Sequence, residues 1–240
     1  MMEHQTFRPG RVIAALVVLF TWAGWTWPGT PEVSASGALT GHRLMIDPGH
    51  GGSDPGAVGP TGLREADVNL RVGLSLRSLL VQYSGATVYM TRDKDMDVTL
   101  EQRTTQANQL GVERFISIHH NASSNQQVNG VETYAYTYAS ADSLDLRDKV
   151  YGELLNWSRL PGRGPNTANF WVLKYTQMPA ILTEASFISN PYQESRLRDP
   201  DYNFREALAI YKGILAHFDT RDAVPTQDPA STWEFLRHLP

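Results

Sequence analysis

Four positions in this chain carry imidazole or carboxylate groups at the ends of predicted strands or at the start of a predicted helix. Side chains at such places can come together in the folded protein. The four positions are His50, Glu65, the pair His119 and His120, and Glu184. Two imidazoles and one carboxylate form a common ligand set for catalytic zinc, which keeps a further position open for water. A second carboxylate nearby could take a proton from that water and pass it to a leaving amine. These residue types predict metal-assisted hydrolysis.

A purely structural role for the same residues stays open at this point. Histidines and glutamates beside strands also occur as loop caps and as surface groups, and spacing alone does not decide between the two interpretations. Nor does it decide which glutamate would bind the metal.

The turn around His50 has the clearest local pattern. The apolar residues 44–46 predict a buried strand, and Pro48, Gly49 and the glycines after His50 cannot continue it without a sharp bend. Ligands of open α/β sheets bind at the carboxyl ends of the strands, so His50 is well placed for chemistry.

The elements that must position these groups alternate along the chain. Helical spacing of Val68, Val72, Leu76 and Leu79 predicts a helix over residues 65–83. Further helices are predicted at 100–110, 141–157 and 202–218, strands at 86–91, 114–118, 130–137, 170–173 and 179–183, and a turn at 161–165. This alternation predicts an α/β fold, with a largely parallel sheet and helices on both faces, in a single catalytic domain over residues 40–219. The carboxyl ends of its strands would share one edge, where the four positions can meet.

Both ends of the chain lie outside this predicted domain. Arg8 and Arg11 precede the apolar run 12–20, and small residues at 33–35 fit a signal-peptidase site. Residues 1–36 are therefore expected to be a cleaved export signal or an uncleaved membrane anchor, and either places the rest of the chain outside the cytoplasm. A buried core helix fits this segment less well. Residues 220–240 are expected to form a C-terminal tail.

Composition excludes several classes of function. The 240 residues carry a net charge of −4 with no long basic run, which argues against nucleic acid as a partner. The sequence contains no cysteine. Disulfides, thiolate zinc sites and a cysteine nucleophile are therefore excluded, and His, Asp and Glu are the strong metal ligands that remain.

Several motifs in order over residues 43–218 resemble the zinc-dependent N-acetylmuramoyl-L-alanine amidases of bacterial cell-wall turnover. They are residues 46–52 (Ile-Asp-Pro-Gly-His-Gly-Gly), 62–65 with Asn69-Leu70, Thr91-Arg92, 117–119 with Asn121-Ala122, 130–133, 168–170 with Val172-Leu173, and Thr183-Glu184 with 187–191. The resemblance implies a hydrolase that cleaves the amide bond between N-acetylmuramic acid and the L-alanine of the stem peptide in peptidoglycan.

The resemblance also implies roles for individual residues. His50, Glu65 and His119 would bind one zinc ion per chain, and Glu184 would be the catalytic acid/base, with no other cofactor. We expect a monomer that touches a membrane only through an uncleaved N-terminal segment. Two alternatives remain, a zinc peptidase that cuts within the stem peptide and a non-catalytic wall-binding relative.

Two residues depart from the family pattern. His120 stands where a small residue is frequent, and Ser186 stands where many relatives have glycine. Neighbours on an extended strand point to opposite faces, so only one of His119 and His120 can face a metal. We expect His120 to face away from it.

Overall fold

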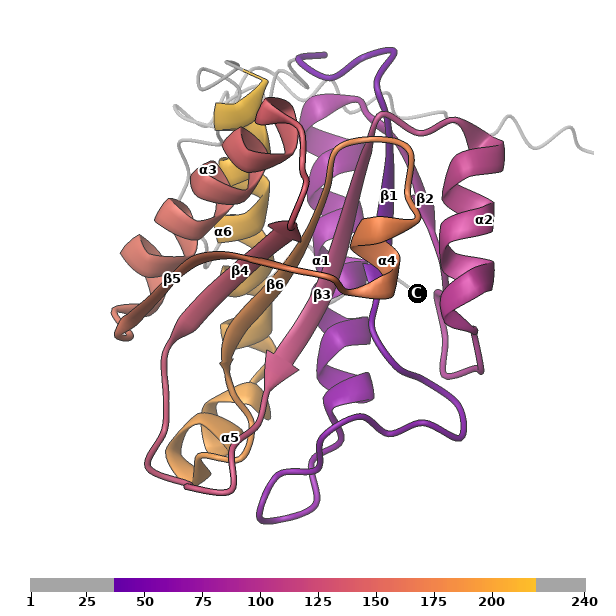
Figure 1. Ribbon diagram of the computed structural model, residues 1–240. Helices are drawn as coiled ribbons and strands as arrows, with labels where there is room; N and C mark the ends of the chain where they lie inside the picture. Colours follow the sequence, from indigo (N-terminus) through magenta and orange to yellow (C-terminus); the bar gives the residue numbers. More distant parts are fainter. Residues whose placement is uncertain (1–36, 219–240) are drawn as a thin grey trace, which may run out of the picture. The chain divides into compact units, whose positions relative to one another are not determined.

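Six strands form one mixed sheet in this computed structural model, which describes residues 37–218 of the chain (Figure 1). The strands are β1 Arg43–Pro48, β2 Thr87–Met90, β3 Arg114–Asn121, β4 Val131–Tyr136, β5 Gly162–Ala168 and β6 Ala180–Phe187. Their order across the sheet is β2-β1-β3-β6-β4-β5. β1, β2, β3 and β6 are parallel, whereas β4 is antiparallel to β6 and parallel to β5. The prediction of a largely parallel sheet is confirmed.

Helices cover both faces of the sheet, as predicted (Figure 1). They are α1 Glu65–Ser84, α2 Leu100–Leu110, α3 Ala141–Ser158, α4 Trp171–Lys174, α5 Pro191–Leu197 and α6 Pro200–His217. The larger core lies where α1, α3 and α6 pack on one face, and a smaller core lies under α2 and α4 on the other. The second face therefore keeps uncovered area for a binding cleft.

The bounds of α1 and α2 follow from local capping. Glu65 in the first turn of α1 places negative charge at the positive end of the helix dipole, and Gly85 ends the helix in the left-handed conformation. α2 begins with a capping box between Thr99 and Gln102 and ends at Gly111. Both helices match the sequence-based bounds to within one residue.

The sequence-based expectation was wrong between α3 and β6. Residues 162–165 of the predicted turn instead begin β5. β5 is an edge strand, where Pro165 is tolerated because one side of the strand's backbone makes no sheet hydrogen bonds. The predicted strand at 170–173 is instead the single helical turn α4, whose Val172 and Leu173 are buried against the smaller core. Tertiary burial overrides the β propensity of this short apolar run.

Three strands are longer than predicted, and one helix was missed. β1 begins at Arg43 and continues to Pro48. β3 includes His119 and His120, and β6 continues past Glu184 to Phe187, so these groups lie within strands instead of after them. Asn190 caps the unpredicted helix α5 by accepting the N–H groups of its first turn.

The predicted export segment or anchor (residues 1–36) and the predicted tail (residues 220–240) lie outside the described residues. Between residues 37 and 218, no helix is long and apolar enough to cross a membrane.

Candidate active site

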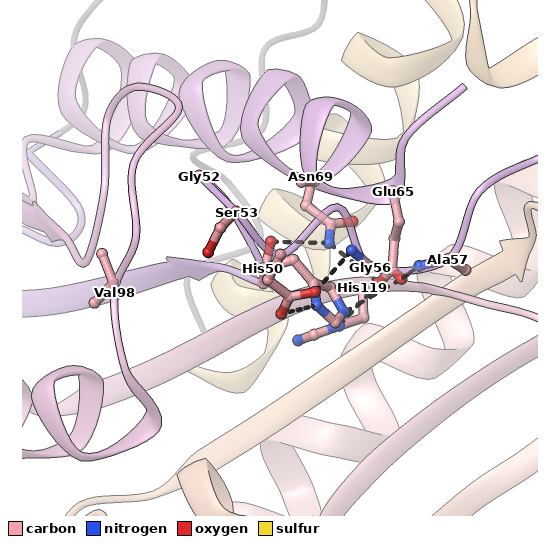
Figure 2. Close-up of polar contacts among 12 residues, drawn as sticks. His50, Gly52, Ser53, Gly56, Ala57, Glu65, Asn69, Val98 and His119 are labelled. Carbon is pink, nitrogen blue, oxygen red and sulfur yellow. Dashed lines mark hydrogen bonds and ion pairs between the residues drawn. The ribbon is translucent and has the colours of Figure 1, made fainter. Parts of the chain in front are cut away.

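Side chains of His50, Glu65 and His119 converge at the carboxyl end of β1 and β3 (Figure 2). One ligand atom from each lies within 4.8 Å of the others. Glu65 Oε2 is 3.3 Å from His50 Nε2, and Glu65 Oε1 is 2.9 Å from His119 Nδ1. The two imidazole rings meet edge to face with centroids 4.9 Å apart. The structure thus brings together the three residues predicted to bind metal.

His50 occupies a strained position in its turn. Its φ of 61° lies in the left-handed region, which residues with a Cβ rarely adopt. Asp54 accepts a hydrogen bond from His50 Nδ1 at 2.7 Å, and Arg103 Nη2 donates to the His50 carbonyl at 2.8 Å. Burial lowers the pKa of His50, but hydrogen bonds to Glu65 and Asp54 outweigh it and raise that pKa to about 8. The aspartate leaves Nε2 facing the cluster, an arrangement typical of metal-binding histidines.

Two arginines, Arg92 and Arg103, donate hydrogen bonds to backbone carbonyl groups of this turn. Arg92 donates to the carbonyl oxygens of Pro48 and Gly49 at 2.9 and 2.8 Å. Arg103 donates to Pro48 and forms a buried ion pair with Asp47 at 2.6 Å. Burial disfavours the charged form of Asp47, yet the Arg103 guanidinium holds the pKa of this carboxyl below its ordinary value. These contacts fix where the β1 turn delivers its histidine.

Glu65 is a buried carboxylate whose side chain is only 5% exposed. Its Oε2 accepts the N–H of Ala57 at 2.9 Å, and its Oε1 accepts Asn69 Nδ2 and the N–H of His120, both at 3.2 Å. Burial raises the pKa of Glu65, but hydrogen bonds to the two histidines of the cluster lower it far below its usual range. These contacts favour the ionised form of Glu65 beside two imidazoles.

The paired histidines point to opposite sides of β3. The His119 ring packs over Gly49, where any Cβ would overlap it, and faces Glu65. The His120 ring is buried on the other side, between Asn69 and Glu206. The expectation that His120 faces away from the cluster agrees with this geometry.

Glu184 is the direct neighbour of two polar residues in the sheet. It pairs in register with His119 of β3 and with Glu132 of β4. Its Oε2 is buried without a hydrogen-bond partner among the described residues. Burial, followed by the charges of Glu65 and Glu132, raises the pKa of Glu184 well above its ordinary value. The pKa of Glu65 is lowered and that of Glu184 is raised. Two carboxyl groups with such different pKa values are suited to different roles in a reaction.

Glu132 is held by its own set of donors. Asn121 Nδ2 and the Tyr134 hydroxyl each donate to it at 2.8 Å, and Arg163 Nε donates at 2.9 Å. Burial and the hydrogen bond to Glu132 raise the pKa of Tyr134 to about 12. This network fixes a negative charge beside Glu184.

A cleft of about 570 Å³ opens over the cluster. Its lining includes Gly49, His50, Asp54, Leu100, Arg103, His119, Phe170, Trp171 and Glu184. Phe170 and Trp171 are 40% and 43% exposed, so α4 gives one wall an aromatic surface. An aromatic wall beside a polar, charged floor can bind an amphipathic substrate against the cluster.

All four residues predicted for the site line this cleft or touch those that do, and their chemical roles stay predictions. Sequence reasoning missed the positioning groups Asp54, Arg103, Glu132 and Glu194. Asp54, four residues after His50, was visible as a carboxylate within reach of an imidazole. Glu194 was not visible: it accepts the N–H groups of Thr61 and Leu63 just before α1, across more than 130 residues of chain.

Comparison with known proteins gives a consistent family. Residues 44–216 match the family model described as N-acetylmuramoyl-L-alanine amidase. The chain is 35% identical over 215 residues to N-acetylmuramoyl-L-alanine amidase CwlM of Bacillus licheniformis, covering 81% of this chain and 83% of that protein. It is 37% identical over 180 residues to a sporulation-specific N-acetylmuramoyl-L-alanine amidase of Bacillus subtilis. This match covers 75% of this chain and 69% of that protein.

A solved structure supports the same assignment. N-acetylmuramoyl-L-alanine amidase AmiC2 of Nostoc punctiforme superposes with a TM-score of 0.70 at 35% identity, covering 74% of this chain and 97% of that one. The similarity in fold and the span matched by the family model lead to the same assignment. The chain belongs to the N-acetylmuramoyl-L-alanine amidase family.

Proposed function

We propose that this chain hydrolyses the amide bond between N-acetylmuramic acid and the L-alanine of the stem peptide in peptidoglycan. His50, Glu65 and His119 hold one zinc ion, and Glu184 is the catalytic acid/base. One observation carries the proposal: the side chains of His50, Glu65 and His119 converge at a cleft that Glu184 also lines. The chain belongs to the amidase family, which supports the same reaction.

The residues of the cluster fit a zinc ion. They offer two imidazole nitrogens and one carboxylate, a common catalytic set. Glu65 is buried and anionic, and a buried carboxylate is stabilised by a bound cation. Asp54 orients His50 from behind, as the outer partners of metal ligands do. All three candidate ligands belong to the same chain, so the proposed site needs no residue from a second copy, and we propose a monomer as the active unit.

The reaction divides between the cluster and Glu184. When bound, zinc supplies a Lewis acid that polarises a carbonyl oxygen and lowers the pKa of a water beside it. Glu184 takes a proton from the attacking water at its carboxylate and delivers it to the alanine nitrogen as the amide bond breaks. The unpartnered Oε2 supports this role, because no other group of the described protein competes for it.

The substrate also sets the place of action. Peptidoglycan lies outside the cytoplasmic membrane, so the proposal includes export, with residues 1–36 as the signal or anchor. The exposed rings of Phe170 and Trp171 would contact the substrate on one side of the scissile bond.

Zinc reconstitution tests this function. The full chain, freed of metal with a chelator, should be inactive on purified peptidoglycan and should recover on addition of about one zinc per chain. Glu184→Gln should take up the same zinc and stay nearly inactive. Glu153→Gln, a change on α3 at the far face of the sheet, is the matched control and should behave like the parent. Full activity in a metal-free preparation would contradict the proposal.

A further inference from the structure

A continuous chain of buried polar groups runs from α6 to the candidate metal ligand Glu65. Glu206 Oε2 is 3.0 Å from His120 Nε2, and His120 Nδ1 is 2.8 Å from Asn69 Oδ1. Asn69 Nδ2 then donates to Glu65 Oε1 at 3.2 Å. The side chains of His120 and Glu206 are both 0% exposed, and Asn69 is fully buried. Burial of so many polar groups is costly unless they are hydrogen-bonded. Within this chain of groups, Glu206 Oε1 is the atom that has no hydrogen-bond partner among the described residues.

The directions of these hydrogen bonds follow from the acceptors. Asn69 Nδ2 lies against two groups that can only accept, the Glu65 carboxylate and the carbonyl of Gly49 at 3.3 Å. Its Oδ1 must therefore face His120, and His120 Nδ1 must donate to it. If that donor were removed, Asn69 Oδ1 would be buried without a hydrogen-bond partner, and the side chain would lose the contact that holds its Nδ2 against Glu65.

We propose that His120, acting through Asn69, positions Glu65 for metal binding, and that Glu206 holds the His120 ring from α6. The inference rests on the proposed role of Glu65 as a zinc ligand. His120 does not touch the cluster with its side chain, so it is a positioning residue. Outer partners of this kind, when changed, lower metal affinity by about 10- to 100-fold.

The two amide replacements of His120 separate positioning from packing. In His120→Asn the amide nitrogen takes the place of Nδ1 and still donates to Asn69. In His120→Gln the amide reaches the place of Nε2 and serves Glu206 instead. Both variants replace the ring with a primary amide, and Asn leaves the larger cavity at this buried site. A merely structural role would therefore affect His120→Asn at least as strongly as His120→Gln.

Zinc affinity of the full chain, measured by competition with a chromogenic chelator, is the readout. We expect the zinc Kd of His120→Asn to stay within about threefold of the parent, and that of His120→Gln to rise about 10- to 100-fold. Equal Kd values for the two variants would overturn the inference. Circular dichroism of the metal-free proteins shows whether each variant folds.

A second variant keeps the test decisive if His120→Gln does not fold. Asn69→Asp keeps the acceptor for His120 but replaces the donor to Glu65 with a carboxylate oxygen. We expect the same loss of zinc affinity, and a parental Kd would overturn the inference. Glu65→Gln distinguishes the two proposals. If it binds zinc like the parent, the proposed metal site fails. If it loses zinc while the His120 variants bind alike, only the positioning role fails.

Discussion

His119 of β3 and Glu184 of β6 stand directly opposite each other on two parallel strands. Residues paired in this way project from the same face of a sheet. Glu132 of β4 is the next residue in the same row. The spacing between the candidate ligand His119 and the candidate base is therefore set by sheet hydrogen bonding, with no loop needed to bring them together.

Replacement of Glu184 should separate binding from catalysis. Glu184→Gln keeps the size of the side chain and removes the base, so hydrolysis should slow by about 10²- to 10⁴-fold while zinc content stays near one per chain. Metal analysis and rates on the same preparation check this. Loss of zinc in the variant would show that Glu184 is a ligand and that the division of roles between Glu65 and Glu184 is wrong.

The pH dependence of the reaction should report the charge of Glu132. Glu184 must be ionised to take a proton, so activity is present above its raised pKa and is lost as the pH falls through it. Glu132→Gln removes a neighbouring negative charge, which lowers the pKa of Glu184 and moves the acid limb of kcat/KM to lower pH.

Asp148→Asn is the control for net charge. It removes one negative charge from an exposed position on α3, where Asp148 pairs with Arg147. Its acid limb should match that of the parent. An acid limb in Glu132→Gln that coincides with the control, or lies at higher pH, would contradict the account of the Glu184 pKa.

Removal of a predicted ligand should abolish metal binding. His119→Ala takes away one of three donors, and the chain should retain well under one zinc after dialysis. His42→Ala is the matched control, because His42 pairs with Glu113 just before β1, at the opposite end of the strand from His50. Zinc retained in His119→Ala at the control level would remove His119 from the ligand set.

The turn that carries His50 should depend on a buried ion pair. Arg103→Met leaves Asp47 buried without its guanidinium partner, and the free energy of unfolding should fall by about 3 to 5 kcal/mol. Arg77→Met, at an exposed position of α1, should change it by less than about 0.5 kcal/mol. Chemical denaturation of both variants checks the difference. A comparable small change in both would show that the pair contributes little.

Sequence reasoning reached the parts of this protein that local signals specify. Three segments carry their own pattern and were predicted: the strand and glycine turn around His50, the helix α2 and the apolar face of α1. The capping box of α2 was not predicted. β5 and α4 were not, because Pro165 is tolerated only at a sheet edge and Val172 becomes helical only through burial on the smaller core. Neither fact is encoded within the segment itself.

Within the site, residue type identified the groups that carry chemistry but not those that hold them. Strand alternation was enough to predict that His119 and His120 face opposite ways. The ion pair of Asp47 with Arg103 joins residues 56 positions apart, and the contact of His120 with Glu206 spans 86. Such contacts depend on the packing of whole helices on the sheet, which one sequence does not reveal.

The identity of the bond that is cleaved is the most direct test of the proposed amidase activity. Purified peptidoglycan is digested with the zinc-loaded full chain and, in parallel, with Glu184→Gln, and the products are separated and their new amino termini labelled. We expect L-alanine to become the new amino-terminal residue and intact stem peptides to separate from unbroken glycan strands. With Glu184→Gln both products should form about 10²- to 10⁴-fold more slowly. New amino termini on any other residue of the stem peptide would identify a peptidase, and no new termini under zinc-loaded conditions would identify a non-catalytic wall-binding protein; either result would contradict the proposed function.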